Sequence, residues 1–108
     1  MKSRVIALLL AAAATLGLQA PAFADAALAT AKNCMACHAV DKKMVGPSYQ
    51  AVSAKYAADK DAVKMLAEKI QKGSTPGKGN WGPVPMPANP QVTEAEATKL
   101  AAWVMTVK

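Results

Sequence analysis

Two cysteines and a histidine within residues 34–38 form a C-x-x-C-H motif, the clearest chemical signal in this sequence. Its members, Cys34, Cys37 and His38, are the only cysteines and the only histidine of the chain. Two thiols at this spacing can add across neighbouring vinyl groups on one edge of a porphyrin, and the next imidazole then lies under the iron. The motif predicts one covalently attached haem c, bound through Cys34 and Cys37, with His38 as an axial iron ligand.

Two other kinds of site use a cysteine pair at this spacing. A thioredoxin-like redox pair occurs in a βαβ context, and no segment of this chain alternates in hydropathy with the period of a strand. A structural zinc site takes four ligands, and the chain has no cysteine or histidine outside residues 34–38. Haem attachment is therefore favoured over both alternatives.

The iron also has an axial position on its other face, and the single histidine excludes a bis-histidine haem within one chain. Methionine, lysine, the chain terminus, water or an empty position remain as alternatives. Met86 is favoured because it lies 48 residues after His38, far enough to fold over the opposite face. Pro85 and Pro87 flank it and stiffen the segment, so the thioether is presented with little entropy to lose. The other methionines lie too close to His38 or in expected helices, where packing is their expected role: Met35, Met44, Met65 and Met105.

The elements that position these residues are expected to be short helices. The clearest covers residues 61–72, because Val63, Leu66 and Ile70 recur at helical spacing. Gly73 follows at the position where helices commonly end. Two further helices are expected from weaker patterns: residues 25–33 and 51–58.

The last expected helix begins with a capping box formed by Thr93 and Glu96. Val92 and Ala97 are spaced for a hydrophobic staple across this start, and Trp103 is expected in the core. The predicted buried stripe of this helix comprises four residues: Ala97, Leu100, Ala101 and Val104.

A long irregular segment separates this helix from the preceding one. Residues 73–90 hold four glycines and five prolines, which exclude a regular helix or strand. The predicted fold class is therefore all-α, with four to five short helices around one covalently bound haem. The long Pro/Gly-rich loop carries Met86, the proposed second iron ligand.

Residues 1–24 have the order of a cleaved secretory signal peptide. Lys2 and Arg4 precede an apolar run over residues 5–18, and an A-x-A site ends at Ala24. The mature protein is then expected to begin at Asp25 and to form one domain over residues 25–108. An uncleaved membrane anchor is the alternative, since residues 5–24 are long enough to cross a bilayer core.

The charge of the chain is mildly basic once the leader is removed. Loss of Lys2 and Arg4 lowers the formal net charge from +6 to +4, and no Lys/Arg run is longer than Lys42-Lys43. This pattern does not support nucleic-acid binding, but it suits attraction to an acidic protein surface. So small a domain also needs a covalent or metal aid to its stability, and a haem would supply one.

Four segments together resemble a known family. The C-x-x-C-H motif is followed in order by residues 45–49 (Val-Gly-Pro-Ser-Tyr), residues 81–87 (Trp-Gly-Pro-Val-Pro-Met-Pro) and the helix with Trp103. This order resembles the small class I cytochromes c of the bacterial periplasm, the group that serves nitrite respiration and related chains. The resemblance covers residues 25–108 and implies a small cytochrome c fold with His38 and Met86 as axial ligands.

The resemblance implies roles for four more residues around the haem. The carbonyl of Pro47 would accept a hydrogen bond from His38, and the indole N–H of Trp81 would donate to a haem propionate. Lys69 lies where the family often has a propionate-pairing arginine, and Asn89 would approach the sulfur of Met86. The alternative roles are packing for Trp81, a solvated charge for Lys69 and a turn for Asn89. Two departures from the family pattern lie nearby: a longer loop over residues 75–80, and Ala88 in place of a common proline.

The implied function is that of a periplasmic carrier of single electrons, not an enzyme. It would connect membrane-bound donors with a terminal reductase, oxidase or photosynthetic reaction centre. A peroxidase-like or gas-binding haem is the alternative, and it requires an open sixth position and distal polar groups. A redox-sensing module is a third class, and it requires an output domain.

The expected partners are redox proteins with acidic docking surfaces, approached through the haem edge. Three lysines lie close in sequence to the attachment cysteines and are candidates to steer that encounter: Lys32, Lys42 and Lys43. The alternative for them is ordinary solubilising charge. We expect a monomer with no stable membrane insertion.

Overall fold

The computed structural model describes residues 22–74 and 81–108. Four helices and one 3-10 turn make up this part of the chain: α1 (Ala22–Ala31), η1 (Cys34–Ala36), α2 (Tyr49–Lys55), α3 (Ala62–Lys72) and α4 (Glu94–Val104). The described residues contain no strand element, which confirms the predicted all-α class. The predicted leader up to residue 21 and the 75–80 loop lie outside the described residues.

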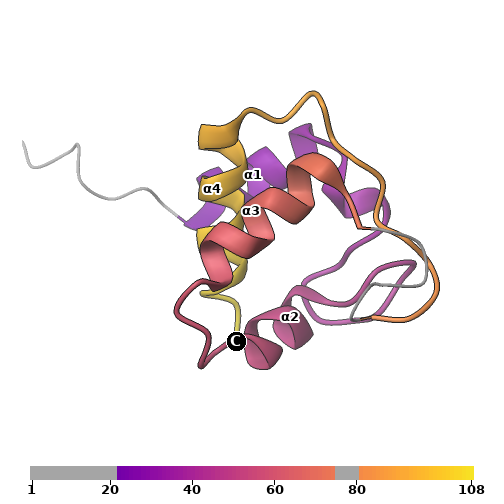
Figure 1. Cartoon of the computed structure of the whole chain (residues 1–108), viewed down its shortest axis with the longest axis vertical. Coiled ribbons are helices and arrows are strands. Elements are labelled where there is room, and N and C mark those ends of the chain that lie inside the picture. Colours follow the sequence, from indigo (N-terminus) through magenta and orange to yellow (C-terminus); the bar gives the residue numbers. More distant parts are fainter. Residues whose placement is uncertain (1–21, 75–80) are drawn as a thin grey trace, which may run out of the picture.

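Helix α4 is the centre of the packing. Helix α3 packs most extensively against it, and α1 and α2 also contact it. Figure 1 shows the segment after residue 80 running along the outside of the molecule before it enters α4. The buried stripe predicted for α4 is confirmed, because Ala97, Leu100, Ala101 and Val104 are all buried. Trp103 is buried as well and belongs to the same core.

The start of α4 is the predicted capping box. Thr93 Oγ1 accepts from the Glu96 N–H at 3.1 Å, and Glu96 Oε1 accepts from the Thr93 N–H at 3.0 Å. The backbone hydrogen bond from Thr93 lowers the pKa of the Glu96 carboxyl, and the nearby Lys32 adds to this effect. Val92 and Ala97, spaced for a hydrophobic staple, are both buried in the core. This helix start therefore follows directly from local sequence.

The other helix boundaries differ from the predicted ones for local reasons. Helix α1 ends at Ala31, two residues earlier than predicted, because the chain turns at Asn33, whose φ of 66° is left-handed. Helix α2 begins at Tyr49 instead of residue 51, because the Ser48 side chain accepts from the Ala51 N–H at 3.1 Å and caps the start. Helix α3 ends at the predicted Gly73, which has a φ of 75°.

Candidate functional site

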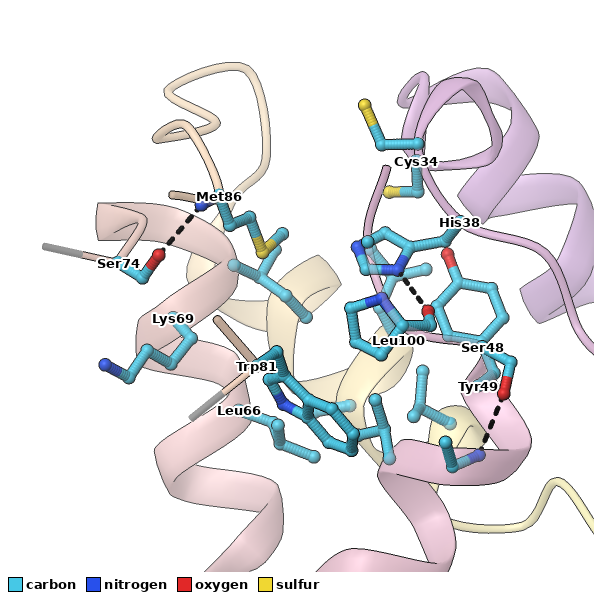
Figure 2. Close-up of a pocket in the computed structure, with 18 of the residues that line it drawn as sticks. Cys34, His38, Ser48, Tyr49, Leu66, Lys69, Ser74, Trp81, Met86 and Leu100 are labelled. Carbon is cyan, nitrogen blue, oxygen red and sulfur yellow. Dashed lines mark hydrogen bonds between the residues drawn. The ribbon is translucent and has the colours of Figure 1, made fainter. Parts of the chain in front are cut away.

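A cavity of about 300 Å³ opens between α2, α3 and the segment that carries Met86. This volume is within the range of cofactor sites, roughly 300–1,000 Å³, and most of the lining side chains are apolar. His38 and Met86 lie on opposite walls, and their side chains point toward one another across the cavity (Figure 2). Seven of the predicted site residues line the cavity: Cys34, Cys37, His38, Pro47, Lys69, Trp81 and Met86.

The two cysteines lie on a tight turn that lines the cavity, and Figure 2 shows Cys34 on the same wall as His38. The turn is closed by the N–H groups of Cys37 and His38, which donate to the Cys34 carbonyl at 3.2 and 3.0 Å. No disulfide joins the two cysteines. Burial raises the pKa of the Cys34 thiol, so it stays protonated at neutral pH. The Cys34 sulfur is therefore present as a thiol, the form that adds across a vinyl group.

The imidazole of His38 is oriented by a backbone carbonyl. Its Nδ1 lies 2.8 Å from the carbonyl oxygen of Pro47, the contact that the resemblance implies. A carbonyl only accepts, so Nδ1 carries the proton and Nε2 keeps its lone pair. The Tyr49 ring stacks on the imidazole at 5.2 Å between centroids and with a 22° interplanar angle. Burial raises the pKa of the Tyr49 hydroxyl, so this ring stays neutral beside the imidazole.

Gly46 is a functional residue that we did not assign from the sequence beyond its place in a loop. A Cβ at this position would lie 2.5 Å from Cε1 and 2.8 Å from Nδ1 of His38. The imidazole therefore packs directly on the backbone of residue 46, and no larger residue fits while the ring keeps its place. The sequence signal for Gly46 was its place in the 45–49 segment that carries the family resemblance, which gave it no role of its own.

Met86 is held through its backbone. Its N–H donates to Ser74 Oγ at 2.8 Å, and its carbonyl accepts from the Ser74 N–H at 2.9 Å. The side chain is half-buried and points into the cavity (Figure 2). No local pattern indicated Ser74, because the contact joins two irregular segments twelve residues apart.

The other three residues to which the resemblance gives a role differ in how they lie relative to the cavity. Trp81 lines the cavity, stands edge-on to Tyr56 at 6.5 Å between centroids, and carries the Lys55 ammonium 5.0 Å from its ring centre. Lys69 lines the cavity with its stem, while its ammonium points outward (Figure 2). Asn89 is not among the lining residues; its amide donates to the carbonyls of Ile70 at 2.8 Å and Pro87 at 3.2 Å. The sulfur-tuning role that the resemblance implies for Asn89 stays a prediction.

The donor set fits the haem that the motif predicts. One wall offers two thiols and an imidazole nitrogen with a lone pair, and the facing wall offers a thioether. The rest of the lining is largely apolar, as a porphyrin requires. Together with the all-α fold, this arrangement defines a c-type cytochrome.

The family comparison agrees with this class. The model of the cytochrome c family matches residues 24–108, and the chain belongs to that family. Cytochrome c-552 of Hydrogenobacter thermophilus is 53% identical over 95 residues, which cover 88% of this chain and 93% of that protein. Cytochrome c-551 of Pseudomonas aeruginosa is 51% identical over 77 residues, 71% of this chain and 70% of that protein.

A solved structure has the same fold. The crystal structure of wild-type Nitrosomonas europaea cytochrome c552 matches with a TM-score of 0.72 and 48% identity, covering 77% of this chain and 99% of that one. The chain is accordingly an electron carrier that binds one covalently attached haem c with its iron. It exchanges electrons with other redox proteins.

Gly46→Ala tests the packing of the His38 imidazole on the backbone of residue 46. The new methyl group would force the imidazole away from Pro47, at a cost of roughly 1–3 kcal/mol for overpacking. We expect a lower free energy of unfolding and a shifted, faster-exchanging NMR signal of the His38 Nδ1 proton. Gly82→Ala is the control, because φ is 111° there but no atom lies within 4 Å of the new Cβ. Gly82→Ala should lower the free energy of unfolding through backbone strain alone and leave the Nδ1 signal unchanged. An unchanged Nδ1 signal in Gly46→Ala would contradict the packing of His38 on residue 46.

Proposed function

We propose that this protein is a periplasmic carrier of single electrons whose haem iron is held between His38 and Met86. The observation that carries the proposal is the convergence of these two side chains from opposite walls of one cavity (Figure 2). The proposed route runs from membrane-bound donors to a terminal reductase, oxidase or photosynthetic reaction centre. The kinship with cytochromes c-551 and c-552 supports the carrier role.

The cofactor, when bound, supplies a one-electron couple at its iron, and a His/Met ligand pair raises the potential relative to harder ligands. The protein contributes two fixed ligands, so neither face has a position for a substrate. No carboxylate lines the cavity in the described part of the chain, and no imidazole other than that of His38 does so. This lining favours electron transfer over a peroxidase-like reaction, which needs an acid or base beside an open iron position.

Met86→Ala tests the ligation directly. Covalent haem should be retained, while the weak near-infrared charge-transfer band of Fe–S coordination should disappear from the ferric protein. The iron should become high-spin or bind a lysine. Met65→Ala is the matched control, because Met65 is the other methionine among the residues that line the cavity. Loss of the band in Met65→Ala and its survival in Met86→Ala would reassign the ligand to α3.

The periplasmic location rests on the leader over residues 1–24. No helix within the described ranges is both long and apolar enough to cross a membrane. Helix α1 begins at Ala22 and so runs across the proposed cleavage point before Asp25. Cleavage there would shorten α1 at its start and leave Ala29, its fully buried residue, in place.

Mass spectrometry of the protein from the periplasmic fraction tests the processing. We expect a chain that begins at Asp25 and carries the mass of one haem, because the A-x-A site ends at Ala24. Replacing Ala24 with a bulky residue should block cleavage and retain the precursor. A membrane-bound wild-type protein that keeps residues 1–24 would support the anchor alternative.

A partner is proposed to dock over the cavity mouth. Exposed apolar side chains lie on the two segments that border it, one just after His38 and one just before Met86 in sequence: Val40, Met44, Val45, Trp81 and Val84. Lys42 and Lys43 are exposed within the same 40–45 segment. An apolar contact with positive charges at its rim suits a redox partner with an acidic surface.

Lys32 does not belong to this rim, contrary to the sequence-based expectation. Its ammonium donates to the Gln91 carbonyl at 3.1 Å and pairs with Glu96 Oε2 at 3.3 Å. Its side chain is only 24% exposed, so these contacts hold it against the protein. The sequence did not indicate this pairing because Gln91 lies 59 residues away.

Reversing Lys42 and Lys43 to Glu tests the docking rim. The spectrum and potential should hardly change, while the bimolecular rate with an acidic redox partner should fall at low ionic strength and recover as salt screens the charges. The double reversal of Lys60 and Lys64 changes the net charge equally at the start of α3, away from the 40–45 loop (Figure 1). Equal slowing by both double variants would show an effect of net charge and remove the lysine pair from the docking site.

A further inference from the structure

The segment that carries Met86 is fastened to the end of α3 by a reciprocal pair of hydrogen bonds. Ser74 donates its N–H to the Met86 carbonyl at 2.9 Å, and its Oγ accepts from the Met86 N–H at 2.8 Å. Both backbone polar groups of Met86 are therefore satisfied by one residue. The Met86 backbone moves away from α3 only when both bonds break.

The close approach of the two segments depends on Gly73. A Cβ there would lie 2.6 Å from the Met86 carbonyl oxygen and 2.7 Å from the Ala88 nitrogen. The φ of 75° at Gly73 turns the chain out of α3 and brings Ser74 alongside Met86. The geometry at the end of α3 thus places Ser74 next to Met86.

A second fastening follows just after Met86. The backbone N–H of Asn89 donates to the Gln71 carbonyl at 3.1 Å, and its side-chain amide donates to the Ile70 carbonyl at 2.8 Å. These are among the last carbonyls of α3, which have no partner within the helix. The ligand segment is thereby anchored both at Met86 and three residues beyond it.

The prolines on either side of Met86 make its backbone stiff. Pro85 and Pro87 have fixed φ angles, and a residue before proline is restricted to extended conformations. The backbone around Met86 therefore has little freedom to bend by itself. A side-chain rotation can move the Met86 sulfur a short way, but a larger withdrawal requires the whole segment to move away from α3. Lifting breaks the hydrogen bonds to Ser74.

We propose that Ser74 is a positioning residue that determines how readily Met86 leaves the haem iron. The proposal rests on the proposed His38/Met86 ligation and extends it to a residue outside the iron coordination. The Ser74 hydroxyl acts through the Met86 N–H and has no direct contact with the iron in this role. Its removal leaves that N–H unpaired and favours the lifted segment.

Cyanide binding to the ferric holoprotein measures the effect, because cyanide must displace the methionine. Removal of one hydrogen bond should raise the cyanide affinity of Ser74→Ala about fivefold, the equivalent of about 1 kcal/mol. The Fe–S charge-transfer band should also disappear at a lower temperature than in wild type. Hydrogen exchange of the Met86 amide should be faster, a readout that does not depend on ligand binding. Ser74→Thr keeps the hydroxyl and should restore wild-type values.

Ser53→Ala is the matched control. The Ser53 hydroxyl is buried and donates to the Met105 carbonyl at 3.0 Å, away from the ligand segment. This variant should lower the free energy of unfolding without changing cyanide affinity or Met86 exchange. A similar rise in cyanide affinity in Ser53→Ala and Ser74→Ala would mean general destabilisation and would overturn the proposal.

The remaining outcomes separate this proposal from the ligation itself. A wild-type protein with the Fe–S band, in which Ser74→Ala has unchanged cyanide affinity and Met86 exchange, would refute the role of Ser74 and leave the ligation intact. A wild-type protein without the band would refute the His/Met ligation and the role of Ser74 with it.

Discussion

The packing of this protein is organised around an apolar cavity that is continuous with its hydrophobic core. Six side chains line the cavity and also belong to the buried core: Tyr49, Val52, Leu100, Ala101, Trp103 and Val104. Much of the remaining core is alanine, so the core residues that do not line the cavity bury little apolar area. A covalently held haem would fill the cavity, pack against these six residues and extend the core. Folding and cofactor attachment therefore depend on the same side chains.

The two walls of the cavity are held in different ways, and the difference matches the two ligands that we propose, His38 and Met86. The histidine wall is built from contiguous sequence, since the attachment turn, Gly46, the Pro47 carbonyl and Tyr49 all lie within sixteen residues. The methionine wall has no such local support and takes its position from the end of α3. A thioether is a weak ligand, so its coordination depends more on where the scaffold places it than that of an imidazole does.

This division also explains which features could be predicted from the sequence. The capping box at Thr93 and the end of α3 before Gly73 each depend on a few neighbouring residues, and both predictions are confirmed. The C-x-x-C-H motif is equally local, and the haem c that it predicts agrees with the family. The pairing of Ser74 with Met86 and the ion pair of Lys32 with Glu96 join distant segments, and no local pattern encodes them. The segment that carries Met86 could be recognised from its prolines, but the contacts that hold it could be identified only from the three-dimensional structure.

The contacts of Lys32 connect the two walls to one another. Its backbone carbonyl accepts from the Gln91 side-chain amide at 3.4 Å, and the same amide lies 3.2 Å from Asn89 Oδ1. Lys32 lies two residues before Cys34, where the attachment turn begins, and Asn89 is hydrogen-bonded to the end of α3. This chain of contacts therefore spans from the cysteine wall to the methionine wall. Each exposed bond is weak alone, but together they join the segments that carry His38 and Met86, the proposed axial ligands. Lys32 is thus held in a contact between segments, and the docking charges that we propose are those of Lys42 and Lys43.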